Sequence, residues 1–195
     1  MTDLKLVGIC GSLRRDSWNR KLLGAARDAF GPARYSEGDL RLPLFDEDLE
    51  AQGIPPEVTT LKTLIAEADA VVIACPEYNK APPGVLKNAL DWLSRGGAPW
   101  RDKPVAIVSA AGGRAGGERT QFALRLMMVP FRAHLLQGPE VMLASPAKAF
   151  DDSGALQDER AAKLLTELME DLRAAAERGS QRSDVLSHAK LYRNS

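Results

Sequence analysis

The chain has 195 residues, of which 45% are apolar, and it carries 26 basic and 26 acidic side chains. A formal net charge of zero gives no global basic field for holding nucleic acid or an anionic membrane, so we expect small molecules or other protein chains as partners. Neither a leader-like N-terminal pattern nor an apolar run of about 18 residues is present, which favours a cytoplasmic protein.

The first half of the chain alternates strand-like and helix-like patterns. Residues 4–9 form an apolar strand, and the helix that begins near Asn19 carries one buried face, made by Leu22, Leu23, Ala26 and Phe30. A weak strand over residues 33–37 leads into a Pro- and Asp-rich surface connection. A helix over residues 58–68 then precedes a strand over residues 70–74, whose continuous apolar run is typical of a parallel sheet covered on both faces.

The next elements repeat this alternation. Pro83 and Gly84 begin a third helix, because proline suits a first helical turn that needs no N–H donor. Residues 105–109 form a strand, and a glycine-rich loop follows it. The helix after that loop, over residues 119–129, is apolar on more than one side and is ended or bent by Pro130.

The end of the chain predicts one more strand and one long helix. The strand lies over residues 134–142, and the helix spans residues 158–178 with a leucine- and alanine-rich stripe. The sequence is polar and net positive from Gly179 onward. We therefore expect one domain over residues 1–178 and a polar tail over residues 179–195.

The cysteines and histidines indicate no covalent or metal framework. Cys10 and Cys75 each end an apolar strand-like run, a position typical of small buried thiols. His134 and His188 are far apart and have no ligand spacing with the cysteines. We expect neither a disulfide nor a metal site.

The order of elements predicts an α/β fold with a mostly parallel sheet and helices on both faces. Ligands of such folds bind outside the carboxyl ends of the strands. Three loops occupy that position, over residues 10–19, 76–83 and 110–118. They are also the least ordinary loops of the chain, so we expect them to form one site.

The first loop has the chemistry of an anion site. Ser12, Ser17 and Asn19 offer side-chain donors, Arg14 adds a positive charge, and a helix N-terminus points at the same place. The lysine of a nucleoside-triphosphate loop and the third glycine of a dinucleotide fingerprint are both missing, which disfavours an ATP-using protein and leaves a terminal phosphate monoester. The alternative is a well-capped helix with solvated arginines.

The second and third loops favour a flat heterocycle at the other end of the site. Tyr78 and Asn79 directly follow a buried strand, where a ring could be stacked upon and hydrogen-bonded at its edge. The third loop, AAGGRAGGER, contains more glycine than a turn needs, which allows close approach of a ligand to backbone N–H groups. The alternatives are that Tyr78 caps the core, that Glu77 is a solvated carboxylate and that Trp92 only packs.

Three stretches together resemble one known family. GSLRRDSWNRKLLGAA, PEYNKAPPGVLKNALDWLSR and KPVAIVSAAGGRAGG resemble the NADPH-dependent FMN reductase family of quinone, chromate and azo reductases. The resemblance covers about residues 4–175, in the same order and spacing. It implies a flavodoxin-like three-layer sandwich with a five-stranded parallel sheet in the order 2-1-3-4-5, one FMN per chain, and NADPH or NADH as electron donor.

The resemblance also implies which residues hold the flavin. The phosphate loop would contribute Ser12, Arg14, Ser17, Trp18 and Asn19, and the ring would lie between two further loops that contribute Pro76, Glu77, Tyr78, Asn79, Ser109, Ala111, Gly112, Gly113 and Gly116. The chain departs from many relatives at two places. Lys80 and Ala81 replace a glycine and a serine, and Ala111 and Gly112 replace a serine and a proline, which puts loop stiffness and acceptor preference in question.

The resulting hypothesis is an FMN-dependent NAD(P)H oxidoreductase that reduces quinones, free flavin or similar small acceptors by a ping-pong hydride mechanism. The flavin carries the chemistry, so no catalytic side chain is required of the protein. The alternative is a non-enzymatic FMN-binding electron carrier or redox-responsive subunit, although a carrier would normally be strongly acidic.

Apolar side chains on two of the predicted helices suggest assembly. The third helix carries Leu90, Trp92 and Leu93, and the fourth carries Leu124, Leu126, Met127 and Met128. A monomer rarely leaves apolar patches of that size open to water. We expect a homodimer or homotetramer with the flavin near the interface.

Overall fold

The computed structural model describes residues 3–191, and side-chain surroundings up to residue 180. Within that range the strands are β1 (Lys5–Cys10), β2 (Arg34–Gly38), β3 (Ala70–Ala74), β4 (Pro104–Ala111), β5 (His134–Leu135) and β6 (Val141–Ala144). The helices are α1 (Trp18–Phe30), α2 (Glu47–Ala51), α3 (Pro56–Glu67), α4 (Gly84–Leu93), α5 (Glu118–Met128) and α6 (Glu159–Leu191), with short 3₁₀ turns η1 (Val129–Phe131) and η2 (Pro146–Lys148).

The strands form one parallel sheet in the order β2-β1-β3-β4-β5, which confirms the predicted order and the flavodoxin-like fold. The strand expected over residues 134–142 is instead two short strands. Both pair with β4, β5 at its beginning and β6 at its end. Pro139 lies between them and has no N–H to donate to a ladder, so one continuous strand is disfavoured there.

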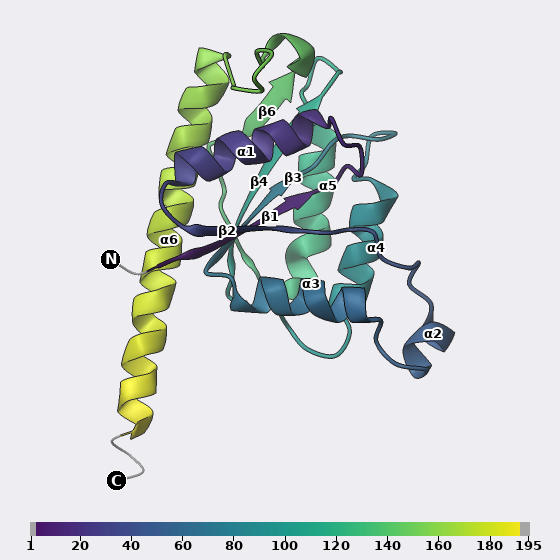
Figure 1. Ribbon diagram of the computed structural model, residues 1–195, viewed down its shortest axis with the longest axis vertical. Coiled ribbons are helices and arrows are strands. Elements are labelled where there is room, and N and C mark those ends of the chain that lie inside the picture. The colour runs from purple at the N-terminus through teal and green to yellow at the C-terminus, as the bar shows by residue number, and fades with distance from the viewer. Residues whose placement is uncertain (1–2, 192–195) are drawn as a thin grey trace.

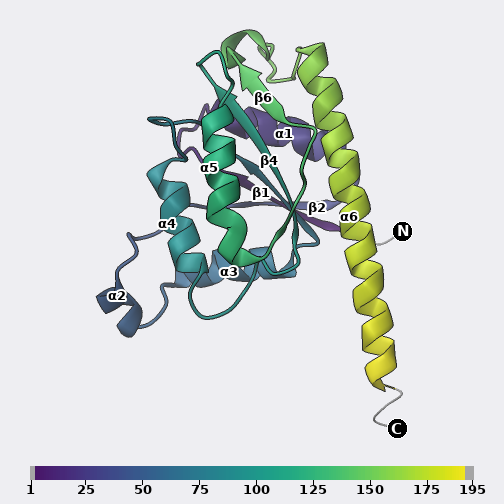
Figure 2. The same cartoon turned by 180° about the vertical axis from the view of Figure 1, so that it is seen from behind.

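Helices cover both faces of the sheet (Figure 1). On one face α1 and α6 bury Leu22, Phe30 and Leu168 against the strands. On the other face, seen from behind in Figure 2, α3, α4 and α5 bury residues such as Ile65 and Leu90. The central strands β3 and β4 are therefore buried on both sides, as their continuous apolar runs predicted.

The apolar residues of α4 are covered by the chain itself, which corrects one basis for the expected oligomer. Leu90, Trp92 and Leu93 are all at most 2% exposed. The connection after β2 folds over this helix, where Trp92 donates its indole N–H to the Pro43 carbonyl at 2.9 Å and meets the Phe45 ring edge-on at 5.0 Å. The prediction treated that connection as a surface segment, so it did not expect the connection to cover the apolar residues of α4.

Helix α6 is longer than expected. It was predicted to end at Arg178, but it continues through Gly179 to Leu191, and its last turns extend beyond the rest of the molecule (Figure 1). A glycine in a helix interior costs about 1 kcal/mol, which is too little to end a helix by itself. The last residues of the expected tail, 192–195, lie outside the described range. No helix in the described part of the chain has the length and apolar character needed to span a membrane.

Candidate functional site

The three expected loops meet at the carboxyl edge of the sheet and enclose a cavity of about 160 Å³. Each loop extends from one of the adjacent strands β1, β3 and β4. The lining residues are Ser12, Arg14, Ser17, Trp18, Asn19, Pro76, Glu77, Tyr78, Ala110, Ala111, Gly112 and Pro146. Ten of these were named from the sequence, Ala110 lies within the predicted third loop without being named, and Pro146 was missed. Pro146 follows β6 at the same edge, so the rule about carboxyl ends could have indicated it.

The first loop contains two buried hydroxyl groups that each accept a backbone hydrogen bond. Ser12 Oγ accepts from the Arg14 N–H at 3.3 Å, and Ser17 caps α1 by accepting from the Asn19 N–H at 3.2 Å. Both serines are 4% exposed. Neither hydroxyl donates to an acceptor within the described residues, so both protons are free for a ligand in the cavity. Ser17 therefore caps helix α1, as the alternative interpretation proposed, and it also lines the cavity.

Asn19 has a different part from the one expected. Its Nδ2 donates to the Ala110 carbonyl at 2.8 Å, and its Oδ1 accepts from the Ala110 N–H at 3.0 Å. The whole amide is thus engaged with the end of β4. Asn19 therefore joins the start of α1 to the third loop. Its role in the site is to fix the position of that loop, because its amide is already bonded to Ala110.

Trp18 closes the site beside this loop. Its ring stacks on Phe150 with centroids 5.8 Å apart and an interplanar angle of 11°. Lys21 Nζ lies 4.7 Å from the centroid of the Trp18 ring, within the range of a cation–π contact. These contacts connect α1 to the segment after η2 and hold Pro146 near the cavity.

The second loop is a tight hairpin that presents Tyr78 to the solvent. Tyr78 and Ala81 exchange two backbone hydrogen bonds at 3.0 and 3.1 Å, and Asn79 and Lys80 between them both have positive φ. Such a turn favours Asn followed by Gly, so Lys80 occupies a conformation that costs a non-glycine residue about 1 kcal/mol. Tyr78 is 51% exposed and borders the cavity, so the interpretation of Tyr78 as a core residue is wrong. Asn79 lies at the turn and does not line the cavity.

Glu77 is a fixed carboxylate, and the alternative of a solvated one is wrong. Its side chain is 17% exposed, accepts from the Thr120 N–H at 3.4 Å and lies 3.8 Å from Arg119 Nη1. Thr120, which the sequence did not single out, also donates its hydroxyl to the Pro76 carbonyl at 3.2 Å. The start of α5 is therefore attached to the second loop at two points.

Cys75 lies beneath these contacts and is not a nucleophile. Its Sγ is 3.2 Å from Thr120 Oγ1 and is fully buried. Burial raises the pKa of the Cys75 thiol to about 12, so the thiolate is absent at neutral pH. Cys10 is buried as well, and both thiols are free, as expected.

The third loop is shaped by residues that do not touch the cavity. Ser109 donates its hydroxyl to the Gly116 carbonyl at 2.7 Å and accepts from Gln121 Nε2 at 2.9 Å. Gly116 has φ +58°, and a Cβ there would lie 2.5 Å from the backbone of Met142. Ser109 and Gly116 therefore fix the loop. Gly113 and Gly116 line a second hollow of about 420 Å³ that adjoins the cavity.

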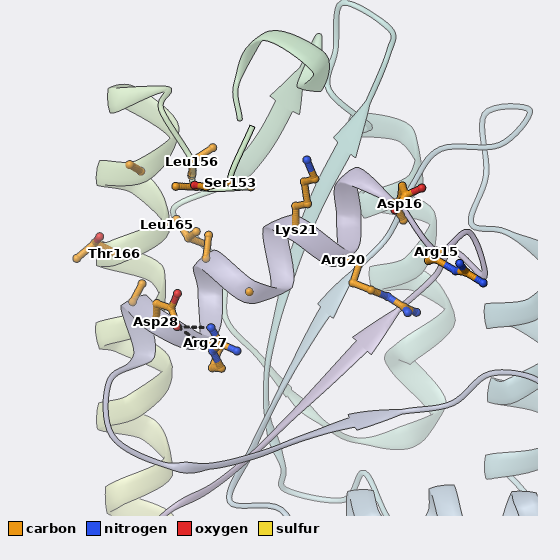
Figure 3. A pocket seen from close by; sticks show the side chains of 17 residues that line it. Arg15, Asp16, Arg20, Lys21, Arg27, Asp28, Ser153, Leu156, Leu165 and Thr166 are labelled. Carbon is orange, nitrogen blue, oxygen red and sulfur yellow. Dashed lines mark hydrogen bonds and ion pairs between the residues drawn. The ribbon is translucent and has the colours of Figure 1, made fainter. Parts of the chain in front are cut away.

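The largest cavity, of about 670 Å³, lies elsewhere, along the outer side of α1 and beside α6 (Figure 3). Three of the six charged side chains that line it form ion pairs, and the Nε atom of Arg20 is buried without a hydrogen-bond partner. Arg20 pairs with Glu37 at 3.0 Å, and Arg27 pairs with Asp28 at 2.7 Å. The α1–α6 groove, as we call this cavity, is not at the carboxyl ends of the strands, and its size alone does not make it the site.

Comparison with known proteins places the chain in a family. The family model described as NADPH-dependent FMN reductase matches residues 4–148. The chain is 42% identical over 173 residues to an NAD(P)H-dependent FMN reductase of Pseudomonas aeruginosa, covering 87% of this chain and 94% of that protein. It is 41% identical over 182 residues to an NAD(P)H:quinone oxidoreductase of Solanum tuberosum, covering 89% and 93%.

Solved structures show the same relationship. The flavoenzyme NAD(P)H:(acceptor) oxidoreductase FerB from Paracoccus denitrificans matches with a TM-score of 0.81 and 30% identity, over 90% of this chain and 98% of that one. A flavodoxin-type WrbA-like protein from Agrobacterium tumefaciens, at 14% identity and a TM-score of 0.58 over 89% and 99% of the chains, shares the fold alone. The chain therefore belongs to the NADPH-dependent FMN reductase family, a family of flavin-dependent oxidoreductases.

Proposed function

We propose that the protein binds one FMN in the three-loop site and uses NAD(P)H to reduce quinones, free flavin or similar small acceptors. The observation that carries this proposal is the pair of buried hydroxyls in the first loop. Ser12 and Ser17 face the cavity with donors that have no acceptor among the described residues. Buried donors are normally paired, so a ligand rich in acceptor oxygens fits them.

The phosphate of FMN fits the first loop. Ser12, Ser17 and the exposed Arg14 supply donors, and the N-terminus of α1 adds its partial positive charge. A Cβ on Gly11 would lie 3.0 Å from Pro76 Cδ, so the first two loops are in close contact. The small space between them suits a single terminal phosphate, which distinguishes FMN from FAD.

The flavin ring fits between the second and third loops. Tyr78 and Glu77 line one side and Ala111 and Gly112 line the other. We propose Pro76, Asn79, Ser109, Gly113 and Gly116 as residues that shape these two walls, and Trp18 and Asn19 as residues that hold the phosphate loop.

FMN held by these three loops would supply the hydride and electron transfer between NAD(P)H and the acceptor. The protein positions the ring and leaves one side of it open at the half-exposed Tyr78. One open mouth serves donor and acceptor in turn, which supports a ping-pong sequence. No side chain needs to act as a nucleophile, in keeping with the protonated Cys75.

We also propose that the protein is a homodimer or homotetramer in contact through α5. Phe122, Leu126 and Val129 are 54, 73 and 67% exposed and lie on or next to α5, whereas Leu124 and Met128 of the same helix are buried. Light scattering at micromolar concentration should give at least twice the 21.1 kDa chain mass. A mass of one chain would contradict the assembly.

The proposed function is tested on the purified protein. A visible flavin spectrum is expected, with FMN as the species released on denaturation. Steady-state oxidation of NADPH or NADH should then depend on an added quinone or free flavin. Release of FAD would overturn the single-phosphate site, and a bound FMN without turnover would favour an electron carrier.

A further inference from the structure

Cys75 and Thr120 contact the second loop of the site but do not line its cavity. We propose that these two side chains are positioning residues. They hold the Pro76 carbonyl at the start of α5 and thereby turn the Glu77 N–H toward the cavity, as a donor for the flavin ring. The proposal rests on the proposed function, because the flavin is the acceptor of that donor.

The Pro76 carbonyl oxygen has two donor side chains beside it. Thr120 Oγ1 lies 3.2 Å from this oxygen, Cys75 Sγ lies 3.5 Å from it, and Oγ1 and Sγ are 3.2 Å apart. The hydroxyl and the thiol each have one proton to donate, since burial raises the pKa of the Cys75 thiol to about 12. The contact between Oγ1 and Sγ holds only one of these two protons. The Pro76 carbonyl therefore accepts at least one proton in every arrangement.

The peptide group between Pro76 and Glu77 transmits this constraint to the cavity. The bond is trans, because the described residues contain one cis bond and it lies elsewhere in the chain. In a planar trans peptide the C=O and the N–H point in opposite directions. The Glu77 N–H is thus directed away from the two positioning residues, and it has no acceptor among the described residues. Both residues of this peptide line the cavity, so its N–H is a free donor for a ligand there.

Both positioning residues are themselves held in place. The Cys75 N–H donates to the Val108 carbonyl at 2.9 Å, and Thr120 is fully buried in the first turn of α5. The N-cap of that helix, Gly117, has no side chain with which to cap it. The Glu77 carboxylate accepts the Thr120 N–H at 3.4 Å instead, at a helix end that favours negative charge. The Glu77 side chain is therefore committed to α5, and its backbone N–H remains for the ring.

A donor at the edge of the ring has a stronger effect on reduced flavin than on oxidised flavin. Reduction adds negative charge to the acceptor atoms of the ring, and hydrogen bonds to those atoms tune its electronics. Thr120 and Cys75 should therefore raise the midpoint potential of a flavin that they do not touch. A role in folding alone would change stability and affinity but would leave the potential unchanged.

The test uses variants that remove the donors and keep the shape of the site. Thr120→Val removes only the hydroxyl, and the double variant Thr120→Val with Cys75→Ala also removes the thiol, which otherwise still reaches the carbonyl. Thr120→Ser is the matched control, because it keeps the hydroxyl. The double variant should bind FMN about fivefold more weakly, the effect of one neutral hydrogen bond, and Thr120→Ser should stay within about twofold of wild type. Reduced FMN should lose about a further fivefold in the double variant, which lowers the two-electron midpoint potential by about 20 mV.

A second measurement needs no flavin. The ¹³C resonance of the Pro76 carbonyl in the apoprotein should move upfield in the double variant and stay in place in Thr120→Ser, because a carbonyl carbon is deshielded by an accepted hydrogen bond. If the double variant does not fold, Thr120→Val alone makes both comparisons, with an expected change of about twofold in affinity.

The outcomes separate this proposal from the proposed function. An unchanged midpoint potential in the double variant, with or without weaker FMN binding, would overturn the positioning role. An unchanged Pro76 resonance would show that Thr120 and Cys75 do not hold the carbonyl. Failure of the wild-type apoprotein to bind FMN would refute the proposed function and the flavin as the acceptor of the Glu77 N–H.

Discussion

The three-loop site and the α1–α6 groove are both polar hollows lined partly by α1, and the groove is about four times larger, at about 670 against 160 Å³. They differ in how their polar groups are satisfied. Arg20 and Arg27 in the groove form ion pairs with acids, although Arg20 Nε is buried without a hydrogen-bond partner, while Ser12 and Ser17 in the site are buried with free hydroxyl protons. Both hollows therefore contain a buried donor without an acceptor, and the place of the three loops at the carboxyl ends of the strands, not volume, identifies the site.

The contrast extends to how closely the backbone is packed. Around the site, Gly116 and Gly117 have positive φ, and a Cβ on either would lie within 3.0 Å of other atoms. Gly112 on the cavity wall and Gly24 in the groove both have no atom within 4 Å of a Cβ position. The third loop is therefore packed with little tolerance at Gly116 and Gly117, whereas its wall at Gly112 and the groove surface can vary.

The largest expected effect is at the third loop. Gly116→Ala would place a methyl group 2.5 Å from the Met142 backbone at a positive φ, at a cost of about 2–5 kcal/mol. The melting temperature should fall by about 10 °C, with loss of flavin binding. Gly112→Ala, where a Cβ meets no atom within 4 Å, should melt within about 2 °C of wild type, since open surface positions cost little. Equal melting of the two variants would contradict the close packing described for the site.

The next effect concerns the free hydroxyls. Ser17→Ala or Arg14→Ala should weaken FMN binding to the apoprotein by about 1–3 kcal/mol, measured by flavin fluorescence titration. Ser17→Ala should also lower stability by about 1 kcal/mol through loss of the α1 cap. Ser153→Ala is the control in the groove, because Ser153 is exposed and donates to Asp151. Unchanged FMN affinity for both site variants would leave Ser17 as a cap only.

An alkaline effect is expected from the thiol beneath the site. The Cys75 pKa is raised by burial from 9.0 to about 12, so between these values the unfolded chain has lost the thiol proton and the folded chain has kept it. Stability should be unaffected by this group below pH 9 and should then fall by up to about 1.4 kcal/mol per pH unit. Burial also raises the pKa of Tyr35 from 10.0 to about 12, which adds to the fall above pH 10.

Denaturant-induced unfolding of wild type and of Cys75→Ala, measured at pH 8, 9 and 10, distinguishes the contribution of the Cys75 thiol from that of the Tyr35 hydroxyl. Between pH 9 and 10, where Tyr35 does not yet contribute, the free energy of unfolding of Cys75→Ala should fall much less with pH than that of wild type. A slope that is the same in both proteins would show that Cys75 is not the group responsible.

The smallest effect belongs to the groove. Gly24 lies inside α1, so Gly24→Ala should raise stability by about 0.5–1 kcal/mol through helix propensity and a less flexible unfolded chain. FMN affinity should not change, because Gly24 lines only the groove. A weaker FMN complex in this variant would mean that groove and site are coupled, and the contrast between them would fail.

The sequence by itself determined the alternation of strands and helices, the parallel sheet and the three loops of the site. These follow from local rules: apolar periodicity marks the elements, and the carboxyl ends of parallel strands meet at one edge. Ten of the twelve cavity-lining residues follow from the same rules together with the family resemblance.

Tertiary structure decided the features that depend on contacts between distant residues. Three such features are the engagement of Asn19 with Ala110, the cover over Trp92 and the partly buried Glu77, each of which joins segments far apart in the chain. Periodicity reports which face of an element is apolar, but it does not report what covers that face. Whether a polar side chain is free for a ligand or already paired depends on its neighbours in space, which periodicity does not report either.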